Sequence, residues 1–247
     1  MPAKKRQSED NSWTSKTEAG LKRADARAKV RRDARLKASG IHLTPFPVLH
    51  STAQFLLAQG PEVATLAAAT EVLLLLGEHW PTQSRPNVSP TTAPVRGMCL
   101  GLVYGLGGQG MKVSKVSESF PSLTAFINRC VAATLPEPCF TWSSLQLNYN
   151  YAAKRHTDGN NLGPSFIAAL GEHTGGGLWT EDHGVVDASG KWAKFNGTKL
   201  HETQPFEGTR LSVIAFTHNA CDELTEATAV ELKNIGASRR RCKDKGV

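Results

Sequence analysis

The sequence lacks the features of a disulfide-stabilised secreted protein and those of a zinc ribbon. Its cysteines are few, odd in number and scattered, and none belongs to a C-x-x-C pair. This pattern favours a reducing compartment over a disulfide framework. No signal peptide is expected, because the N-terminus is charged and has no apolar stretch. We therefore expect an intracellular protein, nuclear or cytoplasmic, with cysteines at Cys99, Cys130, Cys139, Cys221 and Cys242.

The sequence also lacks a hydrophobic run long enough to cross a membrane. The most apolar stretch, VATLAAATEVLLLLG (residues 63–77), is interrupted by Glu71. It is shorter than the roughly 20 residues that a membrane-spanning helix needs, so it is typical of a buried helix. With 247 residues and 40% hydrophobic residues, the chain is long and apolar enough to form a sizeable core. We expect a monomer with no membrane segment.

Positive charge is unevenly distributed along the chain. The net charge of +7 comes largely from residues 4–7, 21–37 and 238–245, so both ends are basic. Basic ends suit a polyanion, because each Lys or Arg that meets a phosphate releases a counterion. A solvated helix and a frayed tail would give the same pattern. Charge alone leaves both interpretations open.

Changes in composition divide the chain into three parts. Residues 1–39 are polar and basic, with Trp13 as their single aromatic residue, and we interpret them as an arm, helical or disordered, outside the core. Residues 40–235 are expected to form the folded domain. Residues 236–247 form a basic tail.

The first half of the folded domain has helical signals. We expect residues 41–135 to supply supporting helices, with the strongest patterns over residues 51–60, 62–78 and 120–133. Residues 81–97 contain four prolines and are predicted to form a loop.

The second half of the folded domain is typical of β structure. The segment FTWSSLQLNYNYA (residues 140–152) alternates between apolar and polar positions, and further short segments follow, each bounded by glycines or polar turns. This succession predicts an antiparallel sandwich or jelly roll over about residues 141–218, and an α+β fold overall. In the first strand the apolar face comprises Leu145, Leu147, Tyr149 and Tyr151, and the polar face Gln146, Asn148 and Asn150.

A possible metal site begins at His156-Thr157-Asp158. Residues i and i+2 of an extended chain face the same way, so His156 and Asp158 can bind one ion. A third ligand must come from another strand, and His173, His183 and His201 are the candidates. His201 is favoured, because the strand that follows it carries a cation suited to an anionic ligand of the same site.

That strand begins with Arg210 in TRLSVIAFTH. Arg210, Ser212, Ile214, Phe216 and His218 are predicted to share one face. An inward-pointing arginine needs an anionic partner, because a buried unpaired guanidinium is costly. A dicarboxylate reaching from the metal to Arg210 and Ser212 would supply that partner.

The combination of H-x-D, a distal His and R-x-S resembles the Fe(II)/2-oxoglutarate-dependent dioxygenase superfamily. The resemblance covers about residues 141–218. It implies a double-stranded β-helix (jelly-roll) core with supporting N-terminal helices, and an oxidoreductase that consumes O2. It also implies Fe(II) bound by His156, Asp158 and His201, and 2-oxoglutarate bound by Arg210, Ser212 and Asn148. Because Asp158 fills the carboxylate position, the site resembles that of hydroxylases rather than halogenases.

A narrower resemblance is to the TET/JBP branch, which oxidises the methyl group of 5-methylpyrimidines in nucleic acid. It rests on H-x-D-x-x-N, which adds Asn161, and on R-x-S-x-x-x-[FY]-x-H, which adds Phe216 and His218. In this family the asparagine and the last histidine contact the polar edge of the base, and the aromatic residue lies against it. The resemblance implies oxidation of 5-methylcytosine to 5-hydroxymethylcytosine and further products, in DNA or RNA.

Two residues near the motif are additional candidates for substrate contact. Trp179 is expected against the cofactor or the base, and Arg155 against a phosphate.

Two alternative functions remain open at this stage. The first is an oxygenase of the same superfamily with another substrate, either an AlkB-like demethylase of nucleic acid or a protein hydroxylase. The second is a non-enzymatic jelly-roll module that binds nucleic acid through its basic ends.

Overall fold

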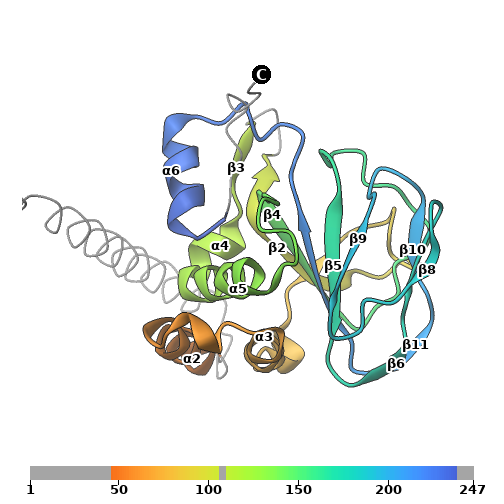
Figure 1. Cartoon of the computed structure of the whole chain (residues 1–247), viewed down its shortest axis with the longest axis horizontal. Helices are drawn as coiled ribbons and strands as arrows, with labels where there is room; N and C mark the ends of the chain where they lie inside the picture. The colour runs from red at the N-terminus through yellow and green to blue at the C-terminus, as the bar shows by residue number, and fades with distance from the viewer. Residues whose placement is uncertain (1–45, 106–109, 238–247) are drawn as a thin grey trace, which may run out of the picture.

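The computed structural model describes residues 46–105 and 110–237. The predicted arm over residues 1–39 lies outside the described residues, and so does the predicted basic tail except for Gly236 and Ala237. The fold combines helices with antiparallel sheets, as the α+β prediction requires (Figure 1).

The larger sheet has seven strands, and its pairings are all antiparallel. In the order in which they pair, its strands are β1 (Thr82–Gln83), β2 (Val95–Tyr104), β4 (Ser144–Tyr149), β12 (Leu211–Phe216), β5 (Ser165–Leu170) and β9 (Trp192–Phe195), with β3 (Met111–Val113) beside β2. The last strand in sequence, β12, therefore lies between β4 and β5, and this position brings Arg210 beside Asn150 and His218 beside Asn161.

Two smaller antiparallel sheets lie on the side of β5 and β9 (Figure 1). One pairs β10 (His201–Thr203) with β7 (Leu178–Thr180) and β7 with β8 (Gly184–Val186). The other pairs β11 (Phe206–Gly208) with β6 (His173–Gly175). A cluster of buried side chains joins β7 of the first small sheet to β5 and β9 of the larger sheet. It includes Ile167, Leu178 and Phe195.

The helices pack on the opposite face of the larger sheet (Figure 1). They are α2 (Phe46–Ala58), α3 (Leu66–Leu74), α4 (Lys115–Ser119) and α5 (Pro121–Thr134), with 3-10 turns at Pro61–Val63 and Gly77–His79. Phe126 and Leu73 from this layer and Leu145, Leu147 and Val213 from the sheet are fully or almost fully buried in one core. A separate helix, α6 (Glu226–Asn234), packs near β3. No helix among the described residues has the length and hydropathy needed to span a bilayer.

The predicted helix over residues 120–133 agrees with α5 to within one residue at each end. The predicted helix over residues 62–78 is shorter, because it breaks into a 3-10 turn, α3 and a second 3-10 turn. Thr65 begins α3 by accepting a hydrogen bond from the Ala68 N–H at 3.0 Å, as an N-cap residue does. Gly77 has a φ of +47°, a conformation that interrupts a right-handed helix and that glycine adopts most readily.

Two details of the sequence-based fold need correction. First, residues 41–135 supply strands as well as helices, and β2 pairs along its length with β4 in the larger sheet. This strand is buried on both faces over most of its length, so it lacks the alternation that identifies a half-exposed strand. Second, Tyr151 does not share the face of Leu145 and Leu147. Asn150 has a φ of +49°, which ends β4 and changes the direction of the following side chain.

Candidate metal centre

A short antiparallel bridge brings His156 and His201 together. The N–H of each residue donates to the carbonyl of the other at 3.0 Å, so the two backbones are paired although the residues are far apart in sequence. The Asp158 N–H donates to the Gly197 carbonyl at 2.8 Å, which fixes the same segment one step further along. Backbone pairing alone thus positions all three predicted ligands.

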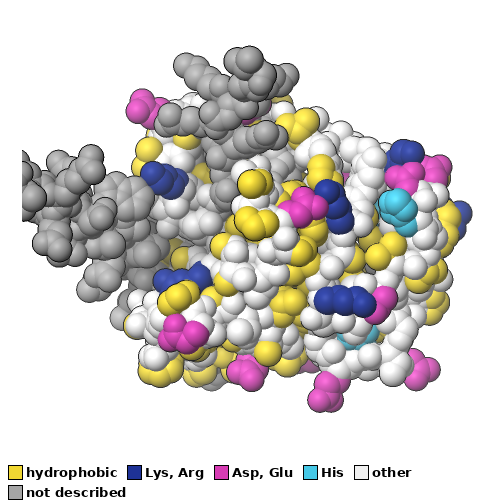
Figure 2. Space-filling view, in the orientation of Figure 1, with side chains coloured by type: hydrophobic (Ala, Val, Ile, Leu, Met, Phe, Trp, Pro, Cys, Tyr) yellow, Lys and Arg dark blue, Asp and Glu magenta, His cyan; other side chains and the backbone are white. Residues whose placement is uncertain are grey.

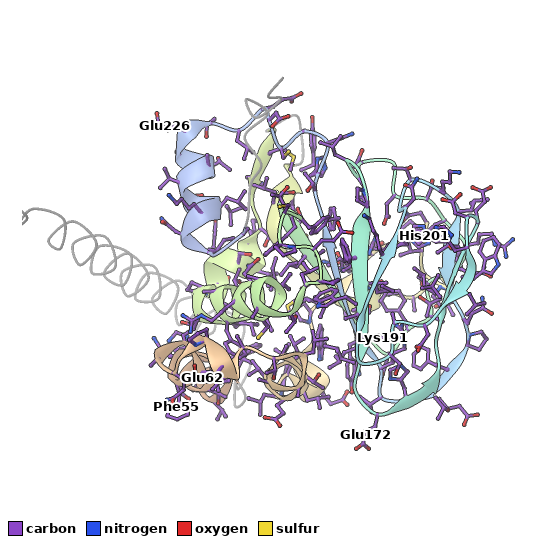
Figure 3. The ribbon with its side chains drawn as sticks, in the orientation of Figure 1. Phe55, Glu62, Glu172, Lys191, His201 and Glu226 are labelled. Carbon is purple, nitrogen blue, oxygen red and sulfur yellow. The ribbon has the colours of Figure 1, made fainter. Side chains whose placement is uncertain are left out.

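The side chains of these three residues converge. The Nε2 atom of His156 lies 3.8 Å from Oδ1 of Asp158, and Nε2 of His201 lies 3.7 Å from Oδ2. One ligand atom from each residue lies within 4.8 Å of the others. His201 is buried at 4% exposure, and the edge of the Phe195 ring packs against it with centroids 5.2 Å apart. Figure 3 shows His201 on the side of the molecule opposite the helices.

Both imidazole rings are held in the orientation that a metal ligand needs. Nδ1–H of His156 donates to the Lys154 carbonyl at 2.7 Å, and Nδ1–H of His201 donates to the Lys199 carbonyl at 2.8 Å. With Nδ1 protonated, the lone pair of a neutral ring lies on Nε2, the atom that faces Asp158. Such backbone contacts to the second ring nitrogen are typical of metal-ligating histidines.

The pKa of His156 is lowered from its ordinary value. The main cause is burial of the ring, and the neighbouring His201 adds to it, while the Lys154 carbonyl and Asp158 act in the opposite direction. Burial therefore favours the neutral imidazole, which is the form that binds metal.

The donor set fits a divalent transition metal. Two imidazole nitrogens and one carboxylate form the facial triad of non-haem Fe(II) sites and leave positions open for other ligands. Calcium and magnesium prefer sites made only of oxygen ligands, so they fit this set poorly. The residues present therefore fit the Fe(II) site predicted from the sequence.

The three ligands line a cavity of about 490 Å³ between the larger sheet and the β10–β7–β8 sheet, here called the central cavity. Its volume is in the range of small-molecule sites. Ser212, Ile214, Phe216 and His218 from β12 and the residues after it also line it, whereas Arg210, predicted on the same face, does not.

Arg210 lies two residues before Ser212, immediately ahead of β12, and it is not among the residues that line the central cavity. It is 3% exposed, and its Nη2 donates to the Gly176 carbonyl at 2.9 Å. Its Nε is buried without a hydrogen-bond partner, and none of the described carboxylates forms an ion pair with it. Burial lowers the pKa of Arg210 to about 10, so the group still carries its charge at neutral pH. A buried cation with an unused donor predicts an anionic ligand.

A polar network includes Ser212 on the wall of the central cavity. The Asn148 Nδ2 donates to Ser212 Oγ at 3.0 Å, and the Tyr151 hydroxyl donates to Asn148 Oδ1 at 2.8 Å. Gln146 Nε2 also donates to Asn148 Oδ1, at 2.9 Å. Sequence reasoning identified Asn148 and Ser212 but missed Tyr151, because strict alternation placed it on the other face.

The three residues predicted to recognise a base all line the central cavity: Asn161, Phe216 and His218. Asn161 and His218 form a β-bridge with each other. The Ala220 N–H donates to Nδ1 of His218 at 3.1 Å, and burial lowers the pKa of this histidine, so the neutral ring presents Nε2–H as a donor. The Nδ2 of Asn161 donates to Ser165 Oγ at 3.1 Å, which fixes the orientation of the amide.

The structure does not bring Trp179 and Arg155 to the central cavity. On β7, Leu178 lines the cavity, so the side chain of Trp179 faces the other way. Arg155 stacks over the Trp179 ring at 4.1 Å and forms a two-pronged ion pair with Glu202, at 3.2 Å from Nε and 3.0 Å from Nη2. This exposed cluster satisfies Arg155 outside the cavity.

The two other candidate ligands lie apart from the metal centre. His173 is on β6, and its Nδ1 lies 3.0 Å from the Gly171 carbonyl. His183 is exposed and lines a separate surface hollow of about 620 Å³ that contains none of the three metal ligands. Of the three candidate histidines, only His201 joins His156 and Asp158.

Comparisons with known proteins find distant structural similarity only. No protein-family model and no curated protein matches the sequence. A solved oxidoreductase of the 2OG-Fe(II) oxygenase family from Burkholderia pseudomallei is similar over 78% of this chain and 94% of its own, with 16% identity and a TM-score of 0.44. A prolyl-4-hydroxylase from Pseudomonas putida is similar over 72% of this chain and 98% of its own, with 15% identity and a TM-score of 0.30.

The first of these proteins carries the name of the enzyme class that the sequence motifs predict. At such low TM-scores, however, similarity of fold does not carry an assignment of function, which has to rest on the side chains of the site. The side chains that matter here are the three convergent ligands and the buried arginine.

Proposed function

We propose that the protein is an Fe(II)- and 2-oxoglutarate-dependent dioxygenase. The observation that carries the proposal is the placement of His156, Asp158 and His201 in one cavity that Ser212 also lines, with Arg210 buried two residues before Ser212 and without an anionic partner. The larger sheet and the β10–β7–β8 sheet enclose this cavity, and helices cover the other face of the larger sheet. A double-stranded β-helix core would provide this arrangement, so the proposal includes that finer description of the fold.

Each residue has a defined part in this reaction. His156, Asp158 and His201 would hold Fe(II), which together with 2-oxoglutarate supplies the activation of O2 and yields succinate, CO2 and a hydroxylated product. Arg210 would bind the far carboxylate of 2-oxoglutarate through its guanidinium, and Ser212 and Asn148 would add hydrogen bonds to it. The enclosing sheets exclude bulk water from these contacts, which strengthens them.

Formation of succinate tests this enzyme class directly. The full-length protein should convert 2-oxoglutarate to succinate when Fe(II) and O2 are present, and chelation of the metal should stop the reaction. Turnover of 2-oxoglutarate is expected to be slow when the main substrate is absent. The assay should therefore be run long enough to detect less than about one turnover per minute. Absence of succinate above the level of a boiled sample, with iron bound, would favour the non-enzymatic jelly-roll module.

We further propose that the main substrate is 5-methylcytosine in nucleic acid. The proposal is supported by Asn161, Phe216 and His218, which line the central cavity with the metal ligands. His218 offers a ring N–H donor suited to a carbonyl oxygen of the base, an amide can pair with the other polar atoms of its edge, and Phe216 offers an aromatic face. A demethylase of nucleic acid or a protein hydroxylase remains the alternative within the same enzyme class.

The distribution of charge supports binding of nucleic acid mainly through the ends of the chain. Among the described residues Asp and Glu outnumber Lys and Arg, although the whole chain carries +7. On the face shown in Figure 2, Lys and Arg side chains are interspersed with Asp and Glu. The excess positive charge lies in residues outside the described part, so binding that depends on charge alone should depend on those residues.

Substitution of the base-recognition residues should reduce turnover of the substrate without weakening binding of 2-oxoglutarate. In Asn161→Ala or His218→Ala, polar atoms of the base lose their partners in a closed cavity, at a cost of roughly 1–3 kcal/mol each. Oxidation of 5-methylcytosine should fall by about one to two orders of magnitude. The measurement is product formation by mass spectrometry, beside the 2-oxoglutarate affinity of each variant.

Asn234→Ala is a suitable control for these variants, because Asn234 is exposed on α6, away from the cavity. Full activity of both cavity variants on 5-methylcytosine would contradict the proposed substrate and leave a dioxygenase with another one. Loss of 2-oxoglutarate affinity would place Asn161 and His218 in the cosubstrate site instead.

A further inference from the structure

Arg85 lies on a loop that is fixed against the metal centre. Its carbonyl accepts hydrogen bonds from the N–H groups of Val88, at 3.1 Å, and Ser89, at 2.8 Å, so the chain turns tightly after it. Val88 is 1% exposed, and its carbonyl accepts from the Lys154 N–H at 3.0 Å. The turn is thereby attached to the segment that carries His156, and the prolines on both sides of it limit its freedom.

The side chain of Arg85 lines the central cavity, and within the described part of the chain it is the single Lys or Arg to do so. Its charge acts on Tyr151, Cys99 and His156, which line the same cavity. Burial raises the pKa of the Tyr151 hydroxyl, Arg85 acts in the opposite direction, and this hydroxyl donates to Asn148. Arg85 therefore lies in the same cavity wall as the polar network of Tyr151, Asn148 and Ser212.

No carboxylate of the described residues forms an ion pair with Arg85, whereas other arginines nearby are paired. Arg96 lies 2.7 Å from Glu78, and Arg155 lies 3.0 Å from Glu202. Ser84 and Asn87, on either side of Arg85, are exposed and also line the cavity, which places this arginine at its open side. A cation that is fixed in place, half-buried and unpaired is suited to bind an anion that enters from solvent.

The two arginines of the site are thus assigned to two different anions. Arg210 is buried two residues before Ser212, where the proposed 2-oxoglutarate would place its far carboxylate. Arg85 lies at the open side, where the main substrate must enter. We propose that Arg85 binds the phosphate group next to the target base, so that one planar guanidinium holds the backbone while the base reaches the metal centre. This inference rests on the proposed nucleic-acid substrate.

Binding measurements without turnover test the assignment. The full-length protein, with metal and 2-oxoglutarate but without O2, is titrated into a fluorescent single-stranded oligonucleotide that contains one 5-methylcytosine. Two further oligonucleotides each carry one neutral methylphosphonate in place of a phosphate next to that base. In one it replaces the phosphate on the 5′ side, and in the other the phosphate on the 3′ side. The proteins compared are the wild type, Arg85→Gln and the control Arg96→Gln, whose loss of a surface ion pair should have little effect.

Arg85→Gln should weaken binding of the unmodified oligonucleotide roughly tenfold. One of the two methylphosphonates should weaken binding to the wild type by a similar factor, but should have no further effect on Arg85→Gln, because both changes remove the same contact. The slope of log affinity against log salt should decrease in magnitude by about 0.7 for the variant, the value for one phosphate contact on a single strand. Arg96→Gln should behave as the wild type.

Four results would overturn the inference. Unchanged affinity of Arg85→Gln, or no measurable binding by the wild type, would remove the phosphate contact. Independent effects of the variant and both methylphosphonates would place Arg85 at another part of the substrate. A loss of 2-oxoglutarate affinity in Arg85→Gln would make it a cosubstrate residue. Succinate formation without oligonucleotide separates each of these results from a failure of the proposed enzyme class.

Discussion

Replacing Asp158 by Ala is expected to reduce 2-oxoglutarate turnover to the level of the metal-free protein. Asp158 is the single carboxylate among the described residues that line the central cavity, and it faces both imidazole Nε2 atoms. Without it, two neutral nitrogens remain, and these hold a divalent ion much more weakly than a set with an anionic ligand. The fold should persist, because the Asp158 N–H that bonds to Gly197 is retained in the variant.

The Asp158→Ala prediction is checked by metal binding as well as by turnover. Added Fe(II), or Mn(II) under air, should raise the melting temperature of the wild type, because an ion that binds the folded state stabilises it by mass action. The same addition should leave the melting temperature of Asp158→Ala unchanged. The matched control is Asp187→Ala, which removes an exposed carboxylate paired with Lys191 at 2.9 Å and should retain both metal binding and turnover. Normal turnover in Asp158→Ala would refute the iron site.

The parts of the site that sequence analysis predicted are those that local periodicity determines. His156 and Asp158 are two residues apart on an extended segment, and Ser212 follows Arg210 with the same spacing. Alternation along a strand was therefore enough to place each pair on one face. The choice of His201 needed one further step, from the strand that follows it, and the structure brings that histidine to the other two ligands.

Sequence analysis missed or misplaced those residues whose position depends on backbone conformation or on contacts distant in sequence. Tyr151 joined the cavity because Asn150 adopts a left-handed conformation, which alternation cannot anticipate. Trp179 lies in a strand of three residues, too short for the pattern to decide which face is inward. Arg85 reaches the site from a proline-rich loop, and the backbone bond between Lys154 and Val88 attaches that loop to the segment that carries His156.

Substitution of Arg210 should separate the cosubstrate site from the rest of the cavity. Arg210→Lys keeps a positive charge but loses the planar fork that can bind a carboxylate with two parallel hydrogen bonds. A hydrogen bond to a charged group contributes about 1.5–3 kcal/mol, so the concentration of 2-oxoglutarate for half-maximal turnover should rise roughly 10- to 100-fold. Arg129→Lys is the matched control, because Arg129 donates to the carbonyls of Leu57 and Gln59 in the helical layer.

Arg210→Met tests the same assignment through stability. In the absence of 2-oxoglutarate this variant should be at least as stable as the wild type, because it replaces a buried guanidinium that has no anionic partner with an apolar side chain. Addition of 2-oxoglutarate at about 100 times its dissociation constant should stabilise the wild type by about 2.7 kcal/mol and Arg210→Met hardly at all. Thermal unfolding with and without the cosubstrate measures both effects. If Arg210→Met loses several kcal/mol without ligand and still responds to 2-oxoglutarate, the guanidinium is a structural group, and another residue must hold the carboxylate.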